Sequence, residues 1–121
     1  MILALLLAVA APAAADRRPV DVRATGEGVL TQKLSDALIA SLGNAKRLRA
    51  AGGDDKPGLS LVILGDVAEK GDRFDYMVDL VEPGSNLSSR RIASMSGTCR
   101  NAQVAKCAAD IVARAERKVR S

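Results

Sequence analysis

The stretch RFDYMVDLVEP, residues 73–83, constrains the fold of this chain more than any other. Apolar and polar side chains alternate along it, which is the period of a strand with one buried face. One face carries Phe74, Tyr76, Val78 and Leu80, and the other carries Arg73, Asp75, Met77 and Asp79. We therefore expect a sheet that packs one face on a core and presents Arg73, Asp75 and Asp79 to solvent.

The flanking segments predict the rest of this sheet. Residues 59–64, LSLVIL, contain almost no polar residues, which is typical of a strand covered on both faces. A turn at 69–72 would join this strand to 73–83 as a hairpin. Weaker strand patterns cover 88–99 and 20–24, and residues 45–51 favour a short edge strand over an extension of the preceding helix.

Two segments show the three-and-four spacing of apolar residues that is typical of helices. The first covers residues 30–42 and should end at Gly43 or Asn44, which adopt the left-handed conformation easily. The second covers 101–120, with Asn101 as its expected amino cap. Four cations gather at its carboxyl end, where they suit the helix dipole: Arg114, Arg117, Lys118 and Arg120.

This element order predicts the fold class. It reads strand, helix, possible edge strand, three antiparallel strands and helix. We expect an α+β two-layer sandwich, with two helices packed on one face of a mainly antiparallel sheet of three to five strands. Residues 16–121 are long enough for a single small domain with one modest core.

Residues 1–15, MILALLLAVAAPAAA, carry no charge and end in an A-x-A pattern, which is typical of a secretory signal peptide. We expect cleavage after Ala15, so that Asp16 becomes the amino terminus. The apolar run is shorter than the roughly 20 residues of a membrane-spanning helix, and an uncleaved anchor is the less favoured alternative. We expect no transmembrane helix in the mature chain. The abundance of alanine and the excess of arginine over lysine favour a bacterial, periplasmic protein.

The two cysteines, Cys99 and Cys107, are expected to form a structural disulfide, the default for a pair in an exported chain. A metal site would need further soft or imidazole ligands, and the chain has no other cysteine and no histidine. Redox pairs usually have two residues between the cysteines, and here there are seven. Free or intermolecular thiols are the remaining alternative. We expect no metal and no cofactor.

The net charge of +4 is too mild to indicate nucleic acid, because single-strand binders also need aromatic platforms. The chain has only two aromatic residues, Phe74 and Tyr76. We interpret both as core residues rather than as a platform for a ligand. The basic end of the last helix could contact an anionic lipid or glycan surface. The residues of a possible ligand or partner surface are Phe74, Tyr76, Arg114, Arg117, Lys118 and Arg120.

The order of helix, apolar strand with a glycine, hairpin and final helix allows a comparison with a known group. The matching positions are Leu38, Leu42, Gly43, Leu64, Gly65, Gly71, Tyr76 and Leu80. The pattern resembles the amino-terminal domain of the translocation protein TolB. It is also similar to the related domain of lipoprotein activators of penicillin-binding proteins. The resemblance implies a periplasmic, non-catalytic, partner-binding module, although the cysteine pair is not part of that pattern.

These observations predict an exported, periplasmic binding or accessory module of the bacterial envelope. Its partners would be unidentified envelope proteins, and an open sheet edge could accept a partner strand. The alternative is a binder of a small ligand or of an anionic envelope polymer. An enzyme is the least favoured reading, because no histidine and no nucleophile–base arrangement is present.

Overall fold

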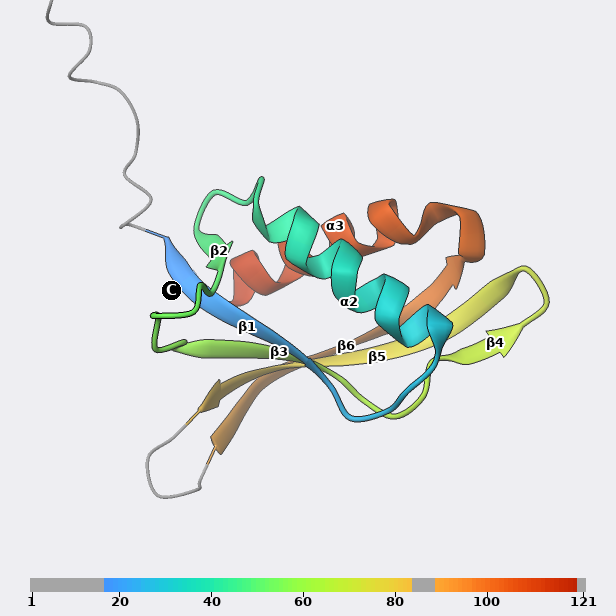
Figure 1. Cartoon of the computed structure of the whole chain (residues 1–121), viewed down its shortest axis with the longest axis horizontal. Coiled ribbons are helices and arrows are strands. Elements are labelled where there is room, and N and C mark those ends of the chain that lie inside the picture. The colour runs from blue at the N-terminus through green and yellow to red at the C-terminus, as the bar shows by residue number, and fades with distance from the viewer. Residues whose placement is uncertain (1–16, 84–88, 120–121) are drawn as a thin grey trace, which may run out of the picture.

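The structure, a computed structural model, describes residues 17–83 and 89–119. Its elements are β1 (Arg18–Ala24), α2 (Val29–Leu42), β2 (Leu48–Ala50), β3 (Leu59–Ile63), β4 (Ala68–Lys70), β5 (Arg73–Pro83), β6 (Ser89–Arg100), the 3-10 turn η2 (Asn101–Gln103) and α3 (Val104–Lys118). Both helices lie on one side of a curled sheet (Figure 1), which confirms the expected α+β class. The expected signal peptide, residues 1–15, and Arg120 lie outside the described residues.

The sheet has six strands and is mixed. β1 pairs in parallel with β2 on one side and with β3 on the other, because α2 carries the chain back across the sheet. β3, β4 and β6 all pair antiparallel with β5. β6 follows the whole length of one side of β5, and β3 and β4 share the other side. The short edge strand expected within 45–51 is present as β2, and β4 is one strand beyond the expected maximum of five.

The core lies between this sheet and the two helices. The apolar face expected for residues 73–83 is buried, and β3 points the alternate side chains Leu59, Leu61 and Ile63 the same way. The two helices complete the core with Leu34, Leu38 and Leu42 from α2 and Ala108, Ile111, Val112 and Ala115 from α3. Each large apolar side chain buried in this way contributes about 1.5–3 kcal/mol relative to exposure.

Both expected helix-end signals act differently from the prediction. Gly43 is right-handed (φ −64°), and α2 closes by tightening, with the Gly43 and Asn44 amides donating three residues back at 3.1 Å. Asn101 does not cap α3, whose N-cap is Gln103. The Asn101 amide donates to the carbonyl of Asp72 at 2.8 Å, so this residue still belongs to the β5–β6 ladder. The η2 turn, residues 101–103, therefore connects the end of β6 to α3, which begins at Val104.

Candidate functional site

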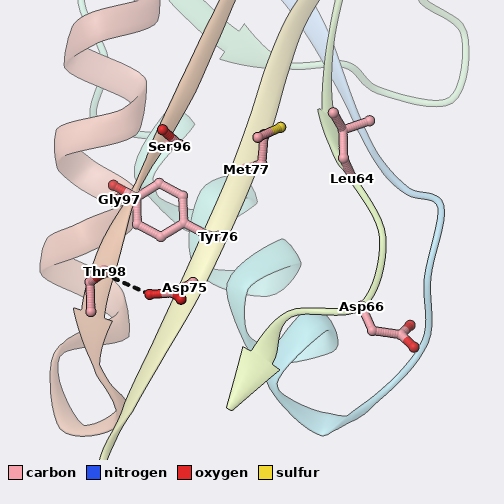
Figure 2. A pocket seen from close by; sticks show the side chains of 8 residues that line it. All are labelled: Leu64, Asp66, Asp75, Tyr76, Met77, Ser96, Gly97 and Thr98. Atoms are coloured by element: carbon pink, nitrogen blue, oxygen red, sulfur yellow. Dashed lines mark hydrogen bonds between the residues drawn. The ribbon is translucent and has the colours of Figure 1, made fainter. Parts of the chain in front are cut away.

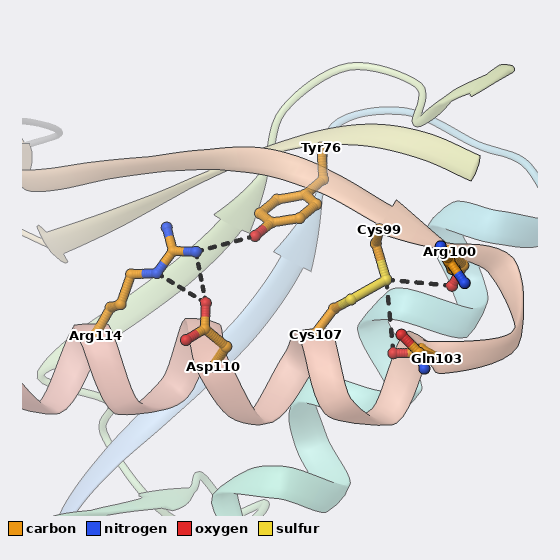
Figure 3. The surroundings of a disulfide bond; sticks show 7 residues. All are labelled: Tyr76, Cys99, Arg100, Gln103, Cys107, Asp110 and Arg114. Carbon is orange, nitrogen blue, oxygen red and sulfur yellow. Dashed lines mark hydrogen bonds and ion pairs between the residues drawn. A yellow bond between two sulfur atoms is a disulfide. The ribbon is translucent and has the colours of Figure 1, made fainter.

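The disulfide joins the end of β6 to the first turns of α3 (Figure 3). Cys99 and Cys107 are bonded with a Cα–Cα distance of 6.2 Å, which confirms the expected pairing. Cys99 is almost fully buried, so this bond is part of the packing between strand and helix. Within residues 17–83 and 89–119, no group of three or more histidine, cysteine or acidic residues is placed to hold a metal ion.

Phe74 and Tyr76 lie in the core between the sheet and the helices. Phe74 is fully buried and Tyr76 is 7% exposed. The Tyr76 hydroxyl accepts a hydrogen bond from Nη2 of Arg114 at 3.3 Å, and the same guanidinium pairs with Asp110 at 2.5 Å (Figure 3). The hydrogen bond to Asp110 raises the pKa of Arg114 above its ordinary value. Of the six proposed surface residues, Phe74 is therefore a core residue, and Tyr76 and Arg114 link the sheet to α3.

The other described cations of α3 join a larger group. Both helices run antiparallel to β1, so their carboxyl ends lie beside the start of that strand (Figure 1). Arg117, exposed in the last turn of α3 together with Lys118, thus lies beside Lys46 and Arg47, which follow α2. A depression of about 370 Å³ between them is lined by Lys46, Arg47, Ala113, Glu116 and Arg117.

The start of β1 completes this group. Arg17 donates to the carbonyl of Ala45 at 3.0 Å, and the amide of Arg18 donates to the carbonyl of Arg47 at 2.9 Å. We call this group the basic pole: Arg17, Arg18, Lys46, Arg47, Arg117 and Lys118. None of its members forms an ion pair within the part of the chain that the structure describes. Two acidic side chains lie near it. Glu116 accepts from the Arg47 amide at 2.5 Å, and the pKa of Glu82 is lowered by its hydrogen bond from Arg90 and also by the charge of Arg18.

Only two described members of the basic pole, Arg117 and Lys118, belong to the surface expected from the sequence. The others come from segments that the sequence keeps far apart. One local signal was present, because the triplet Ala45-Lys46-Arg47 directly follows the expected stop of the first helix. Helices packed side by side in the same direction bring such segments together at their carboxyl ends.

The outer face of the sheet carries a shallow depression of about 430 Å³ (Figure 2). Asp75 accepts from the Thr98 hydroxyl at 2.7 Å and pairs with Lys70 at 2.9 Å. The hydrogen bonds from Lys70 and then Thr98 lower the pKa of Asp75. Asp66 accepts from the amide of Glu27 at 2.8 Å. Both carboxylates of the depression therefore have structural partners.

Asp79 departs from the expected solvent-facing position. It is 8% exposed, accepts from the Ser94 hydroxyl, and lies 3.9 Å from Nη1 of Arg91. The expectation of a solvated side chain was wrong here because neighbours on β6 cover it. Asp75 and Asp79 have different hydrogen-bond partners and do not form a pair of cooperating carboxylates.

The free edge of β6 is the longest open backbone in the described chain. β6 has 12 residues and, among the described strands, pairs only with β5. Because Asn101 donates toward β5, the alternation of an antiparallel ladder turns the backbone groups of Ser94, Ser96 and Thr98 outward. These three residues are exposed. Such an edge is a template for strand addition.

No described helix has the length and apolar character needed to span a membrane. This statement applies to residues 17–83 and 89–119.

Comparison with known proteins gives a fold likeness only. No family model and no curated protein matches the chain. Among solved structures, protein XCC0632 of the family DUF330 from Xanthomonas campestris matches with a TM-score of 0.65 and 9% identity, over 85% of each chain. An uncharacterised protein matches at 0.53 and 10% identity, over 84% of this chain and 92% of that one. A PelC dodecamer from Paraburkholderia phytofirmans matches at 0.50 and 12% identity, over 85% of each.

The chain has a DUF330/PelC-like fold. The resemblance to the TolB amino-terminal domain and to the penicillin-binding-protein activators was wrong, since the structural likeness is to these other proteins. The residues that suggested it mark a helix, an apolar strand and a hairpin. Those elements recur in many small α+β domains, so their order alone does not identify a group.

Proposed function

We propose that this chain is an exported module of the bacterial envelope that acts by binding other macromolecules and carries out no catalysis. The signal-like sequence at residues 1–15 supports the export. The Cys99–Cys107 disulfide suits an oxidising compartment outside the cytoplasm. The observation that carries the binding role is the free edge of β6.

A strand that adds to this edge would gain backbone hydrogen bonds from Ser94, Ser96 and Thr98. Their side chains are short, so they leave room for a second backbone to approach. Affinity in this mode comes from the main chain, and specificity comes from side chains on alternate positions. Charged residues at the two ends of β6, Arg90 and Arg100, would limit the register of the added strand.

A second copy of this chain is the partner that we propose first. A PelC protein with a similar fold was solved as a dodecamer. Among the described strands, the sheet has unlike open edges, with β2 beyond β1 and with β6 and the short β4 on either side of β5. An interface between unlike edges is heterologous, and such interfaces close into rings when the rotation allows it.

The self-association can be tested with Ser96→Pro on the purified mature chain. Proline removes an outward-facing amide without removing a bond to β5, so the domain should fold while assembly is lost. Light scattering behind a sizing column would measure the mass, and Ser96→Ala is the matched control. Equal assembly of the proline and alanine variants would exclude the β6 edge as the contact. A monomer at every concentration would exclude self-association.

Export is tested separately by mass spectrometry of a periplasmic extract. The expected species starts at Asp16 and is lighter than its reduced form by the mass of two hydrogens. An intact Met1 together with two alkylatable thiols would contradict the proposed location.

A further inference from the structure

We propose that the basic pole docks on the phosphate groups of an anionic phospholipid surface, with the carboxyl ends of both helices facing the lipid. This inference rests on the extracytoplasmic location proposed above and not on the edge of β6. It concerns a surface that the sequence pattern indicated only in part, through Arg117 and Lys118.

The charge of the pole exceeds what the fold requires. The carboxyl ends of α2 and α3 each present about half a negative charge, so the two dipoles together offset about one cation. Glu116 offsets one more, and Glu82, which also pairs with Arg90, offsets part of the charge of Arg18. The pole carries six cations, and within the described residues none of them is in an ion pair. Most of this positive charge therefore faces solvent without a partner in the protein.

The layout of the cations suits a surface more than a single anion. They come from three segments, namely the start of β1, the residues after α2 and the last turn of α3. Arg18, Lys46, Arg47, Arg117 and Lys118 are all exposed. A plane of headgroups can contact all of these segments together, whereas one phosphate would contact only the side chains nearest to it.

The charge of the rest of the molecule would orient it on such a surface. The opposite end of the sheet, where β1 and β3 end and β5 begins, carries a group of carboxylates. These are Glu27, Asp66, Glu69, Asp72 and Asp75. Lys70, Arg73 and Arg100 lie at the same end and largely offset these carboxylates, with Lys70 paired to Asp75. An anionic surface therefore attracts the basic pole more strongly than this end, so the helices would stand with their carboxyl ends toward the lipid.

The path of the chain agrees with this orientation. A hydrogen bond to the carbonyl of Ala45 holds Arg17 at the pole. In the sequence, only one residue, Asp16, separates Arg17 from the apolar stretch of residues 1–15. During export that apolar sequence is held in the membrane. The basic pole is then the part of the folded domain closest to the lipid.

The contact should be electrostatic and reversible. The large apolar side chains that are exposed, Val29, Ile39 and Met77, belong to other surfaces and would not insert at the pole. Each lysine or arginine near an anionic surface contributes about 1 kcal/mol, which is about fivefold in the partition coefficient. Salt should weaken the binding strongly because the contributing charges are exposed.

The test is cosedimentation of the purified mature chain with vesicles. We expect binding to vesicles that contain phosphatidylglycerol, loss of that binding at high salt, and no binding to pure phosphatidylcholine. The triple variant Lys46→Ala, Arg47→Ala, Arg117→Ala should bind about a hundredfold more weakly. Binding of the triple variant equal to the parent, or equal binding to both kinds of vesicle, would overturn the proposal.

The matched control removes the same net charge from the opposite end, with Lys33→Ala, Arg73→Ala and Arg100→Ala. All three side chains are exposed. This control should retain most of the vesicle binding, and if it fell as far as the pole variant, net charge and not the pole would be responsible. Circular dichroism of both triple variants checks that they fold.

Two further measurements separate the possible causes. Inorganic phosphate at the same ionic strength as chloride should displace no more protein; selective displacement by phosphate would indicate a discrete anion site and would overturn the lipid surface. Ser96→Pro loses any avidity that assembly provides, but it should still bind phosphatidylglycerol vesicles, and the triple pole substitution in this background should remove that binding, so failure of the β6 edge and failure of the basic pole are distinguishable. Absence of vesicle binding at low salt would refute the inference and leave the edge proposal untouched.

Discussion

Replacing Gly97 with alanine should destabilise the domain, because Tyr76 occupies the space that a Cβ would need. The two residues are directly opposite each other on β5 and β6. A Cβ on Gly97 would lie 2.7 Å from the Tyr76 hydroxyl oxygen and 3.0 Å from Cζ. Gly97 has no positive φ, so its backbone accepts alanine and the cost is one of contact alone.

The size of the effect follows from two opposing terms. Overpacking in a filled core costs about 1–3 kcal/mol, and the ring cannot move away without weakening its bond to Arg114. Alanine restricts the unfolded chain, which returns about 0.4–1 kcal/mol. We expect a net loss of about 1–2 kcal/mol in the free energy of unfolding.

The matched control is Gly53→Ala, where a Cβ would meet nothing within 4 Å. Urea unfolding followed by circular dichroism measures both variants. In a Tyr76→Phe background the nearest clashing atom is gone, so Gly97→Ala should cost less there, with a coupling of about 0.5 kcal/mol or more. A Gly97→Ala protein as stable as Gly53→Ala, or one with no coupling to Tyr76→Phe, would refute this account.

Three other perturbations have expected outcomes. Replacing both cysteines with alanine should lower the free energy of unfolding by about 2.5 kcal/mol in the loop-entropy model, measured by urea unfolding. Arg73 and Arg100 are directly opposed on β5 and β6. Arg100→Thr should therefore raise the midpoint of urea unfolding at low salt, with the gain lost at high salt; no gain would contradict the repulsion. The hydrogen bond from Arg49 lowers the pKa of Asp55 to about 2, below its unfolded value, so its stabilisation exists above that value and is lost as pH falls toward 2. The stability gap between the parent and Asp55→Asn should accordingly shrink from pH 5 to pH 2, roughly, and a gap independent of pH would contradict it.

Local patterns predicted the parts of the fold that local physics determines. The alternation in residues 73–83 identified both faces of β5, because one buried face imposes a period of two. Gly43 marked the end of α2, although the mechanism was a tightened turn. β4 was missed because it is three residues long and exists only by pairing with the start of β5. The burial of Asp79 depends on β6 neighbours, which no local pattern of β5 reveals.

The candidate site was predictable only where one element supplies it. The disulfide followed from the presence of two cysteines in a chain that we expected to be exported. The basic pole could not be assembled from the sequence, because Arg17, Lys46 and Arg117 meet only through the parallel packing of two helices. The pattern also assigned Arg114 to the surface, although Tyr76 and Asp110 hold it in place.

The position of β1 inside the sheet determines when this domain can form. Its partners, β2 and β3, lie about 30 and 40 residues further along the chain, so β1 has nothing to pair with until those residues have been synthesised. No amino-terminal fragment that ends before β3 can pair both sides of β1. Both cysteines lie near the carboxyl end, so their bond can form only after the residues of β1 to β5 have been made, and it secures strands that were able to pair before it.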